Sequence, residues 1–353
     1  MQAVTTTIES VRSELSRYTF RRMGMGELRL VNDLFNRCHH TNRAMPEAEW
    51  LYKDHPYGEA IILGAFAPDE ELVGVLPAMA HTFLWNDREE AGYQLIDAVT
   101  APAHRGRGLF GHLVELICAM VAEKHFAVFA FPNEQSLSVY QKTGVLETIC
   151  DWGTRARVLV WPAYVQYKLG RGGRGSATSD GASLSDGEIS LVPVHRFESD
   201  FEDIQAAVGK GVTSLTLRRK EFLNWRYFGF APRHYAAALI GRGDRTEGYA
   251  VVRMIDGIAH VMDLLVTPDG RTARKAVRLV TRWAKHMGAI AIYFSASGDK
   301  FIRRALYGNG FLLKRRGGTI VLDPRSVRRL TSVQQRPLEA DDFYFVMGDG
   351  DFH

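Results

Sequence analysis

Apolar and polar residues follow each other along this chain in patterns that predict both strands and helices. Short apolar runs bounded by Pro, Gly and polar clusters indicate strands, and apolar residues repeated every three or four positions indicate amphipathic helices. In the first half, strands are expected over 20–23, 60–66, 72–81, 93–102, 126–131 and 155–160. Helices are expected over 27–38, around 50–52, over 109–124, and before Gly144. This mixture predicts an α+β fold.

A segment near the middle of the chain is rich in small residues. Between Gly170 and Gly187, ten of eighteen residues are Gly or Ser. Such a composition cannot bury enough apolar surface to hold one conformation. The length of 353 residues also favours two cores over one. We therefore expect a linker over 166–188, an N-terminal domain over 1–165 and a C-terminal domain over 189–353.

The second half of the chain repeats the spacing of the first. One set of landmarks is Trp50, Tyr52 and Pro56, which recur as Trp225, Tyr227 and Pro232. Another set is Asp97, Pro102 and Gly144, which recur 166 positions later as Asp263, Pro268 and Gly310. Because this offset is constant across a strand, a helix, a second strand and a second helix, the repeat predicts two copies of one fold.

Composition and charge exclude several classes of protein. The chain is 46% hydrophobic and has a formal net charge of +4 without a long Lys/Arg block, so neither a membrane span nor a nucleic-acid partner is expected. Three cysteines without a Cys-x-x-Cys pair predict neither a disulfide framework nor a zinc site, and no metal is expected. The polar start lacks a signal core, which favours a cytoplasmic location.

A turn broken by two glycines follows the expected strand over 93–102. It reads His104-Arg105-Gly106-Arg107-Gly108-Leu109 and leads into the helix over 109–124. Glycine lets the backbone approach a ligand closely, and the unpaired N–H groups at a helix start favour a phosphate. A P-loop would need a Gly-Lys-Ser/Thr ending, and a dinucleotide fold would need a third glycine and a later acidic residue. Neither pattern fits.

The segment from Arg105 to Phe110 resembles the pyrophosphate loop of the GNAT superfamily of acyl-CoA-dependent N-acyltransferases, with the pattern Gln/Arg-x-x-Gly-x-Gly/Ala. The chain departs from this pattern at Phe110, which Gly111 follows. Asn133 and the tyrosine four residues before Gly144 are also similar to the family. The resemblance implies two tandem GNAT-like domains, each a central mixed, mostly antiparallel sheet flanked by helices. It also implies acetyl-CoA or another acyl-CoA as co-substrate.

The same resemblance implies site residues in the first copy. The expected cofactor-binding residues are Ala98, Val99, Thr100, Arg105, Gly106, Arg107, Gly108, Leu109, Phe110 and Asn133. Tyr140 is the expected general acid for the coenzyme thiolate, because its phenol keeps its proton at pH 7; its alternative is a packing residue. Asp97 is the best-placed carboxylate for a general base. Its counterpart Asp263 in the second copy favours a structural role instead.

In the second copy, Thr272 and Arg274 replace Gly106 and Gly108. Their side chains would occupy the space that a pyrophosphate needs, so we expect this copy to have lost cofactor binding and to border the acceptor site. The expected acceptor-binding residues are His39, His40 and Asn42, and in the C-terminal tail Asp349 and Asp351. The tail enters this set because N-myristoyltransferases, a similar tandem family, use their chain terminus in the active site.

The favoured function is therefore transfer of an acyl group from a CoA thioester to the amine of a small-molecule acceptor, by direct attack in a ternary complex. The chain loosely resembles tandem enzymes that acylate nucleotide-linked amino sugars. One alternative is a Fem-type transferase that uses aminoacyl-tRNA, although no helical hairpin arm is evident. A second alternative is a non-catalytic module that senses CoA. The sequence does not indicate the oligomeric state.

Overall fold

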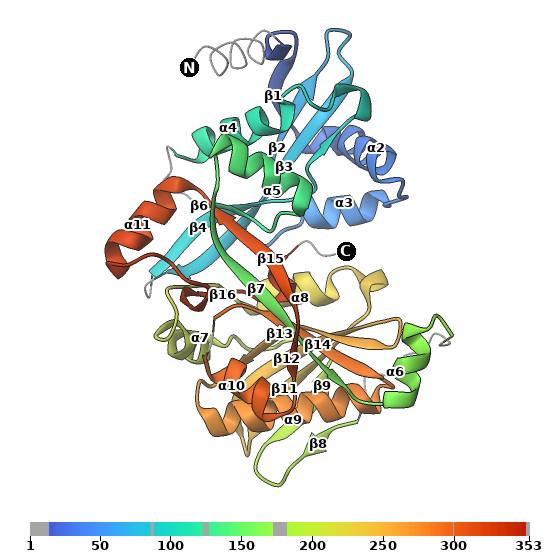
Figure 1. Ribbon diagram of the computed structural model, residues 1–353, viewed down its shortest axis with the longest axis vertical. Coiled ribbons are helices and arrows are strands. Elements are labelled where there is room, and N and C mark those ends of the chain that lie inside the picture. Colours follow the sequence, from blue (N-terminus) through green and yellow to red (C-terminus); the bar gives the residue numbers. More distant parts are fainter. Residues whose placement is uncertain (1–13, 86–87, 123–126, 172–181, 299, 351–353) are drawn as a thin grey trace. The chain divides into compact units, whose positions relative to one another are not determined.

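The computed structural model describes residues 14–85, 88–122, 127–171, 182–298 and 300–350 (Figure 1). It divides into two compact units, and neither unit is one continuous stretch of the chain. The first comprises Met1–Thr82, Glu90–Ile149 and Thr319–Pro337. The second comprises Phe83–Glu89, Cys150–Gly318 and Leu338–His353. Residues 172–181 of the expected linker lie outside the described residues.

The first unit has a mixed sheet in the order β1-β2-β3-β4-β6-β15. Its strands are β1 (Thr19–Met23), β2 (Ile61–Phe66), β3 (Leu72–Trp85), β4 (Arg88–Leu95), β6 (Ala127–Ala130) and the end of β15 (Leu312–Leu322). β4 and β6 run parallel, whereas β1–β2, β2–β3 and β6–β15 are antiparallel. A short strand, β5 (Val99–Thr100), pairs with β3.

The helices of the first unit bury apolar faces against this sheet. They are α2 (Leu28–His39), α3 (Met45–Tyr52), α4 (Leu109–Ala122), α5 (Glu134–Thr143) and α11 (Pro324–Gln334), with short 3₁₀ turns at Met25–Glu27 and Pro102–His104. Leu113, Ile117 and Val121 of α4, spaced by four, are all buried in the core. Gly111 lets α4 approach α5, since an added Cβ there would lie 3.2 Å from Cγ2 of Thr143.

The second unit has a sheet in the order β7-β14-β13-β12-β11-β9-β8. Its strands are β7 (Glu147–Val158), β8 (Leu184–Ser185), β9 (Ser190–Val194), β11 (Tyr235–Arg242), β12 (Arg245–Ile255), β13 (Ile258–Val266) and β14 (Ala291–Ala296). β13 and β14 are parallel, and the other neighbours are antiparallel. Two short strands, β10 (Ser214–Thr216) and β16 (Phe343–Tyr344), pair with each other.

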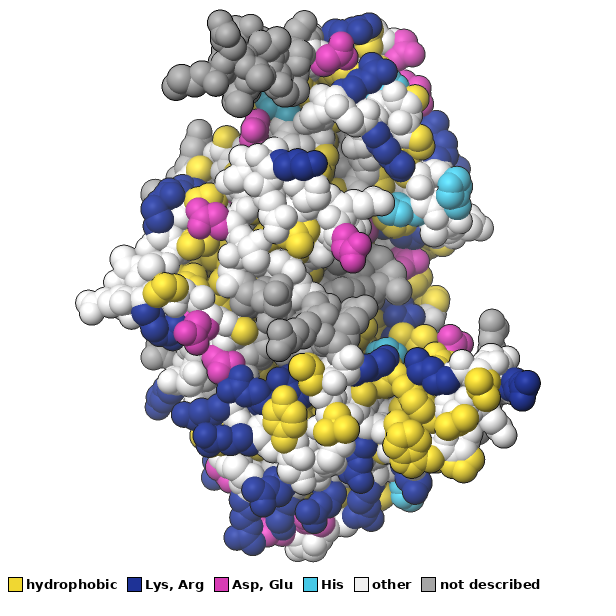
Figure 2. Space-filling view, viewed as in Figure 1, with side chains coloured by type: hydrophobic (Ala, Val, Ile, Leu, Met, Phe, Trp, Pro, Cys, Tyr) yellow, Lys and Arg dark blue, Asp and Glu magenta, His cyan; other side chains and the backbone are white. Residues whose placement is uncertain are grey.

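The helices of the second unit include a long, strongly basic one. They are α6 (Trp161–Lys168), α7 (Glu202–Gly209), α8 (Lys220–Phe228), α9 (Gly270–His286) and α10 (Lys300–Gly308), with 3₁₀ turns at Ala231–Arg233, Ala340–Asp342 and Met347–Asp349. Figure 2 shows Lys and Arg side chains gathered over α9 and α10. No helix of the described residues is long and apolar enough to cross a membrane.

The last strand of each repeat pairs in the sheet of the other unit. β7 follows α5 of the first repeat, but its residues Gly153 to Val158 pair with β14. β15 follows α10 of the second repeat, but Val321 and Leu322 pair with β6. By its position in the sequence, the strand expected over 155–160 falls in the N-terminal domain. In the structure, the backbone partners of its residues 153–158 belong to the second unit.

Candidate acyl-CoA site

A pocket of the first unit lies at the start of α4 and has a volume of about 370 Å³. The end of α2, β5, the turn before α4 and the start of α5 line it. Nine of the expected cofactor-binding residues are on its lining: Ala98, Val99, Thr100, Arg105, Gly106, Gly108, Leu109, Phe110 and Asn133. The fold therefore brings these residues together in one pocket. The sequence had grouped them only by resemblance to a family. Their role in binding a cofactor stays a prediction.

The turn before α4 leaves a row of main-chain N–H groups without an acceptor. Gly106 and Gly108 have φ angles of 77° and 83°, which residues with side chains rarely adopt. The N–H of His112 donates to the Gly108 carbonyl at 3.1 Å. Among the described residues, none accepts a hydrogen bond from the N–H groups of residues 106–111. A helix start in this condition favours an anion.

The strand expected over 93–102 is interrupted at Asp97. β4 pairs with β6 as far as Gln94, and Asp97 then adopts a left-handed conformation with φ of 47°. β5 follows and, among the described strands, pairs only with β3. The second edge of β5 has no strand partner among the described residues where it lines the pocket, although the Thr100 carbonyl accepts a hydrogen bond from the Arg105 side chain at 3.1 Å. An open strand edge offers main-chain groups to a bound chain such as pantetheine.

The Asp97 carboxylate is buried between two partners instead of facing the pocket. A guanidinium nitrogen of Arg43 donates to it at 2.5 Å, and the Tyr52 hydroxyl donates to the same oxygen at 2.5 Å. The side chains of Arg43 and Asp97 are 5% and 4% exposed. Burial and the nearby Asp97 charge raise the pKa of Tyr52 well above its usual value, so its hydroxyl stays a donor.

The second unit repeats this arrangement. Arg218 donates to the Asp263 carboxylate at 3.0 Å, and the Tyr227 hydroxyl donates to it at 3.2 Å. Asp263 stands 166 positions after Asp97, as the repeat predicts. The sequence reasoning missed the arginine, although a signal existed: Arg218 follows Arg43 by the same 175 positions that separate the two Trp-x-Tyr motifs. A duplicated Arg–Asp–Tyr cluster is thus part of the architecture of each unit.

Tyr140 lies in the core beside the pocket. It is 3% exposed, and its ring centroid is 5.4 Å from that of Phe110, which lines the pocket. Its chain neighbour Val139 also lines the pocket, whereas Tyr140 itself does not. This placement satisfies the packing role considered for the residue. Proton transfer from its hydroxyl stays a prediction.

Of the other site residues expected in the first unit, some line the pocket and some do not. His39 lines the pocket, whereas His40 ends α2 with φ of 54° and, like Asn42 in the following loop, is not on the lining. Arg107 also turns its side chain elsewhere. Its guanidinium donates to the Tyr18 hydroxyl at 3.1 Å and to a main-chain carbonyl at 3.2 Å. The structure therefore gives the Arg107 side chain protein contacts where a phosphate is expected from the sequence.

The corresponding helix start in the second unit is already capped by an acidic residue. The Asp269 carboxylate accepts hydrogen bonds from the N–H groups of Arg271 at 2.8 Å and Thr272 at 3.0 Å. Burial raises the pKa of Asp269, but these hydrogen bonds lower it more, and the pKa lies below its usual value. Thr272 is 1% exposed. The carboxylate fills the position at the helix start that would attract a phosphate.

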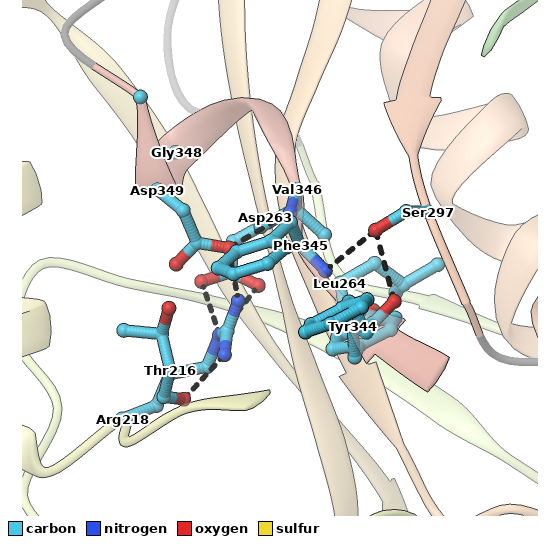
Figure 3. A network of polar contacts seen from close by, with 12 residues as sticks. Thr216, Arg218, Asp263, Leu264, Ser297, Tyr344, Phe345, Val346, Gly348 and Asp349 are labelled. Atoms are coloured by element: carbon cyan, nitrogen blue, oxygen red, sulfur yellow. Dashed lines mark hydrogen bonds and ion pairs between the residues drawn. The ribbon is translucent and has the colours of Figure 1, made fainter. Parts of the chain in front are cut away.

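The C-terminal segment packs at the ends of β13 and β14 (Figure 3). The Tyr344 hydroxyl donates to the carbonyl of Leu264 in β13, and the Ser297 N–H, just after β14, donates to the Phe345 carbonyl at 2.9 Å. Gly348 packs so closely that an added Cβ would lie 2.9 Å from the Met262 carbonyl. The C-terminal segment thus covers main-chain groups of β13 and β14 in the second unit.

Asp349 belongs to this segment, and one oxygen of its buried carboxylate has two hydrogen-bond donors. It accepts hydrogen bonds from Arg218 and from the Val346 N–H, each at 2.8 Å, and its side chain is 2% exposed. Burial raises its pKa above the usual value even though the Arg218 charge opposes this. The placement differs from the expected grip on an acceptor amine, because the side chain is buried and paired with Arg218. Asp351 lies outside the described residues.

No group of three or more His, Cys, Asp or Glu side chains among the described residues is arranged to hold a metal ion.

Residues 19–146 match the family model of the acetyltransferase (GNAT) domain. No curated protein sequence gave a match. The match to the family model covers the strand, the glycine turn and the three helices that line the pocket.

Solved structures with a similar fold cover most of the chain. A probable N-acyltransferase from Enterococcus faecalis is 14% identical with a TM-score of 0.60, over 86% of this chain and 71% of that one. A GCN5-related N-acetyltransferase from Anabaena variabilis is 15% identical with a TM-score of 0.61, over 87% and 72%. Saccharomyces cerevisiae N-myristoyltransferase with bound myristoyl-CoA is 12% identical with a TM-score of 0.55, over 87% and 83%. At these identities the likeness shows the fold, two tandem GNAT-like copies.

Proposed function

We propose that the chain is an acyl-CoA-dependent N-acyltransferase and that the pocket at the start of α4 holds the acyl-CoA, since residues 19–146 match the GNAT family model and supply the lining of this pocket. The observation that carries this proposal is the row of N–H groups over residues 106–111, which no described residue satisfies. They would bind the diphosphate, while the second edge of β5 takes the pantetheine. The capped helix start of the second unit lacks this capacity.

The proposed reaction is direct attack of a neutral amine on the thioester carbonyl. A C–N bond forms as the C–S bond breaks, and main-chain N–H groups near β5 would stabilise the oxyanion. The coenzyme leaves as a thiolate and takes a proton, which we assign to Tyr140. The amine loses a proton to solvent. In this scheme a Tyr140→Phe variant loses kcat more than affinity for acyl-CoA, and an unchanged kcat would remove Tyr140 from the mechanism.

We assign Asp97 a positioning role in place of proton abstraction. Its carboxylate is held by Arg43 and Tyr52, and the three residues that follow it line the pocket. The cluster thus fixes the left-handed turn from which β5 departs. A general base would need a carboxylate oxygen within reach of the acceptor amine. The same cluster also occurs around Asp263 in the second unit, where the helix start is capped by Asp269, so the cluster does not depend on a cofactor.

The binding proposal is tested by titrating the full chain with acetyl-CoA and with longer acyl-CoAs. Gly106→Ala should weaken binding about tenfold or more, because its Cβ enters the space of the diphosphate and its φ is unfavourable for alanine. Gly270→Ala is the matched control, since it adds the same atom at the capped helix start where nothing lies within 4 Å. Equal binding by both variants would place the coenzyme elsewhere.

For the acceptor we propose a small-molecule amine, with nucleotide-linked amino sugars as the first class to test. The loose resemblance to tandem sugar N-acyltransferases supports this choice, and His39 on the pocket lining supplies a polar contact. A thiol-release screen of amino sugars, their nucleotide-linked forms and simple amines against several acyl-CoAs measures turnover directly. Acyl-CoA binding without turnover of any amine would favour the CoA-sensing alternative.

A further inference from the structure

A second pocket, wholly within the second unit, is lined by basic side chains. Its volume is about 570 Å³, and β7, the second half of α9 and the end of α10 line it. Four of its residues are Arg157, Arg278, Arg282 and Lys285, and no Asp or Glu belongs to the lining. A hollow of this size is typical of small-molecule sites. Its charge is of one sign only.

Among the described residues, the four cations have no acidic partners, unlike Arg271 and Lys275 earlier on the same helix. None of them forms an ion pair with a described residue; Arg282 makes a single long contact, 3.4 Å, with a main-chain carbonyl. By contrast, Arg271, earlier on α9, pairs with Glu188 at 2.6 Å, and Lys275 pairs with the same carboxylate. Arg271 and Lys275 are thus compensated by acidic groups, whereas the described residues supply no such partner for the cations that line the pocket.

The fold itself does not require these charges. Arg278 and Arg282 are four residues apart on α9, so their like charges repel each other and destabilise the helix. The equivalent helix of the first unit, α4, shows what the architecture needs at these positions. By the repeat offset of 166, Arg278, Arg282 and Lys285 correspond to His112, Leu116 and Ala119. The basic cluster is thus an addition to the second copy, made at a cost in helix stability.

We propose that this pocket binds a small ligand carrying two or more phosphate groups. Three guanidinium groups offer paired N–H donors that match phosphate oxygens, and Lys285 adds a point charge. A single phosphate would leave most of these donors unused. The cations converge on one hollow, which favours a compact ligand over a long nucleic-acid strand.

The test is calorimetric titration of the full chain with inorganic pyrophosphate and with ADP. The double variant Arg278→Ala/Arg282→Ala should bind about 100-fold more weakly, since each lost charged contact is worth about a factor of ten. Arg196→Ala is the control, because Arg196 is 72% exposed, outside the pocket and only loosely paired with Glu198. Binding should also weaken as salt rises from about 50 to 200 mM.

Because the acyl-CoA site of the first unit also attracts phosphates, each titration is repeated in a Gly106→Ala background, which weakens that site. Pyrophosphate binding that survives in Gly106→Ala and is lost when the double variant is added to it supports the proposal. The double variant should keep its melting temperature, since both side chains are on the exposed face of α9. No binding of either ligand, or equal binding by the double variant, overturns the proposal. A single-stranded oligonucleotide that binds more tightly than ADP replaces it with a nucleic-acid surface.

Discussion

Replacing Asp97 by asparagine removes the negative charge beside Arg43 and keeps the size of the side chain. The backbone at this position has φ of 47°, and asparagine tolerates that conformation as well as aspartate does. The substitution therefore changes the electrostatics without adding backbone strain. Asp263→Asn makes the same change beside Arg218 in the second unit.

The expected loss of stability follows from burial. With the carboxylate gone, the Arg43 charge is left in a site where its side chain is only 5% exposed. Removing one partner of such a buried pair costs about 3–5 kcal/mol. For a unit of this size, each kcal/mol lowers the melting temperature by about 2–4 °C. We therefore expect Asp97→Asn to melt about 6–20 °C below the parent chain.

The assay combines thermal unfolding with the pH dependence of kcat. If Asp97 positions β5, then Arg43→Gln and Asp97→Asn both lose stability and activity, and the residual kcat keeps its pH profile. Tyr52→Phe should lose less stability, about 1.5–3 kcal/mol, because only one hydrogen bond to a charged group is removed. The reasoning is refuted if Asp97→Asn is as stable as the parent and its kcat no longer rises with pH, which is the signature of a lost general base.

Three further predictions use other parts of the chain. Burial lowers the pKa of His260 from 6.5 to about 4, and the nearby Lys314 and Arg253 charges act in the same direction, so about 3 kcal/mol of stability present above pH 6.5 is lost as the pH falls from 6.5 to 4. Urea titrations at several pH values should lack this loss in His260→Gln. Acyl-CoA should slow the alkylation of Cys38, because Cys38 lines the pocket assigned to it, whereas Cys118 stays unreactive because burial raises its pKa to about 12. Equal alkylation rates of Cys38 with and without acyl-CoA, measured by peptide mass spectrometry, would contradict the assigned site. Gly348→Ala should cost about 1–3 kcal/mol, because its Cβ would overlap a buried tyrosine hydroxyl, whereas Gly26→Ala meets nothing and should unfold at the parent temperature.

Most of the elements near the pocket could be predicted from the sequence because their signals are local. The helix expected over 27–38 is observed at Leu28–His39, and the helix expected from residue 109 begins at Leu109. Amphipathic spacing of apolar residues and glycine turns are properties of neighbouring residues, and they identify such elements without knowledge of the rest of the chain. For the same reason, the residues of the glycine turn are sufficient by themselves to indicate a place for a phosphate.

The partners of Asp97 and Asp349 could not be predicted in this way. By residue type and position alone, each carboxylate is a candidate for catalysis or acceptor binding. In the structure, each is buried against an arginine more than fifty residues away along the chain. Whether a carboxylate faces a pocket or a guanidinium depends on which segments pack around it. A single sequence gives no direct signal for such a contact, although the repeated offset of the Trp-x-Tyr motifs would have identified the arginines.

By itself, the sequence determined that the chain contains two copies of one fold and that the turn at Gly106 and Gly108 could approach a phosphate, since spacing and glycine content are sufficient for both. Only the tertiary structure decided that β7 and β15 pair outside the unit of their own repeat, that β5 pairs with β3 alone among the described strands, and that the C-terminal segment covers main-chain groups of β13 and β14 in the second unit. The physical reason is that strand pairing is selected among edges distant in the chain, by burial and hydrogen bonding that exist only once the whole chain has folded.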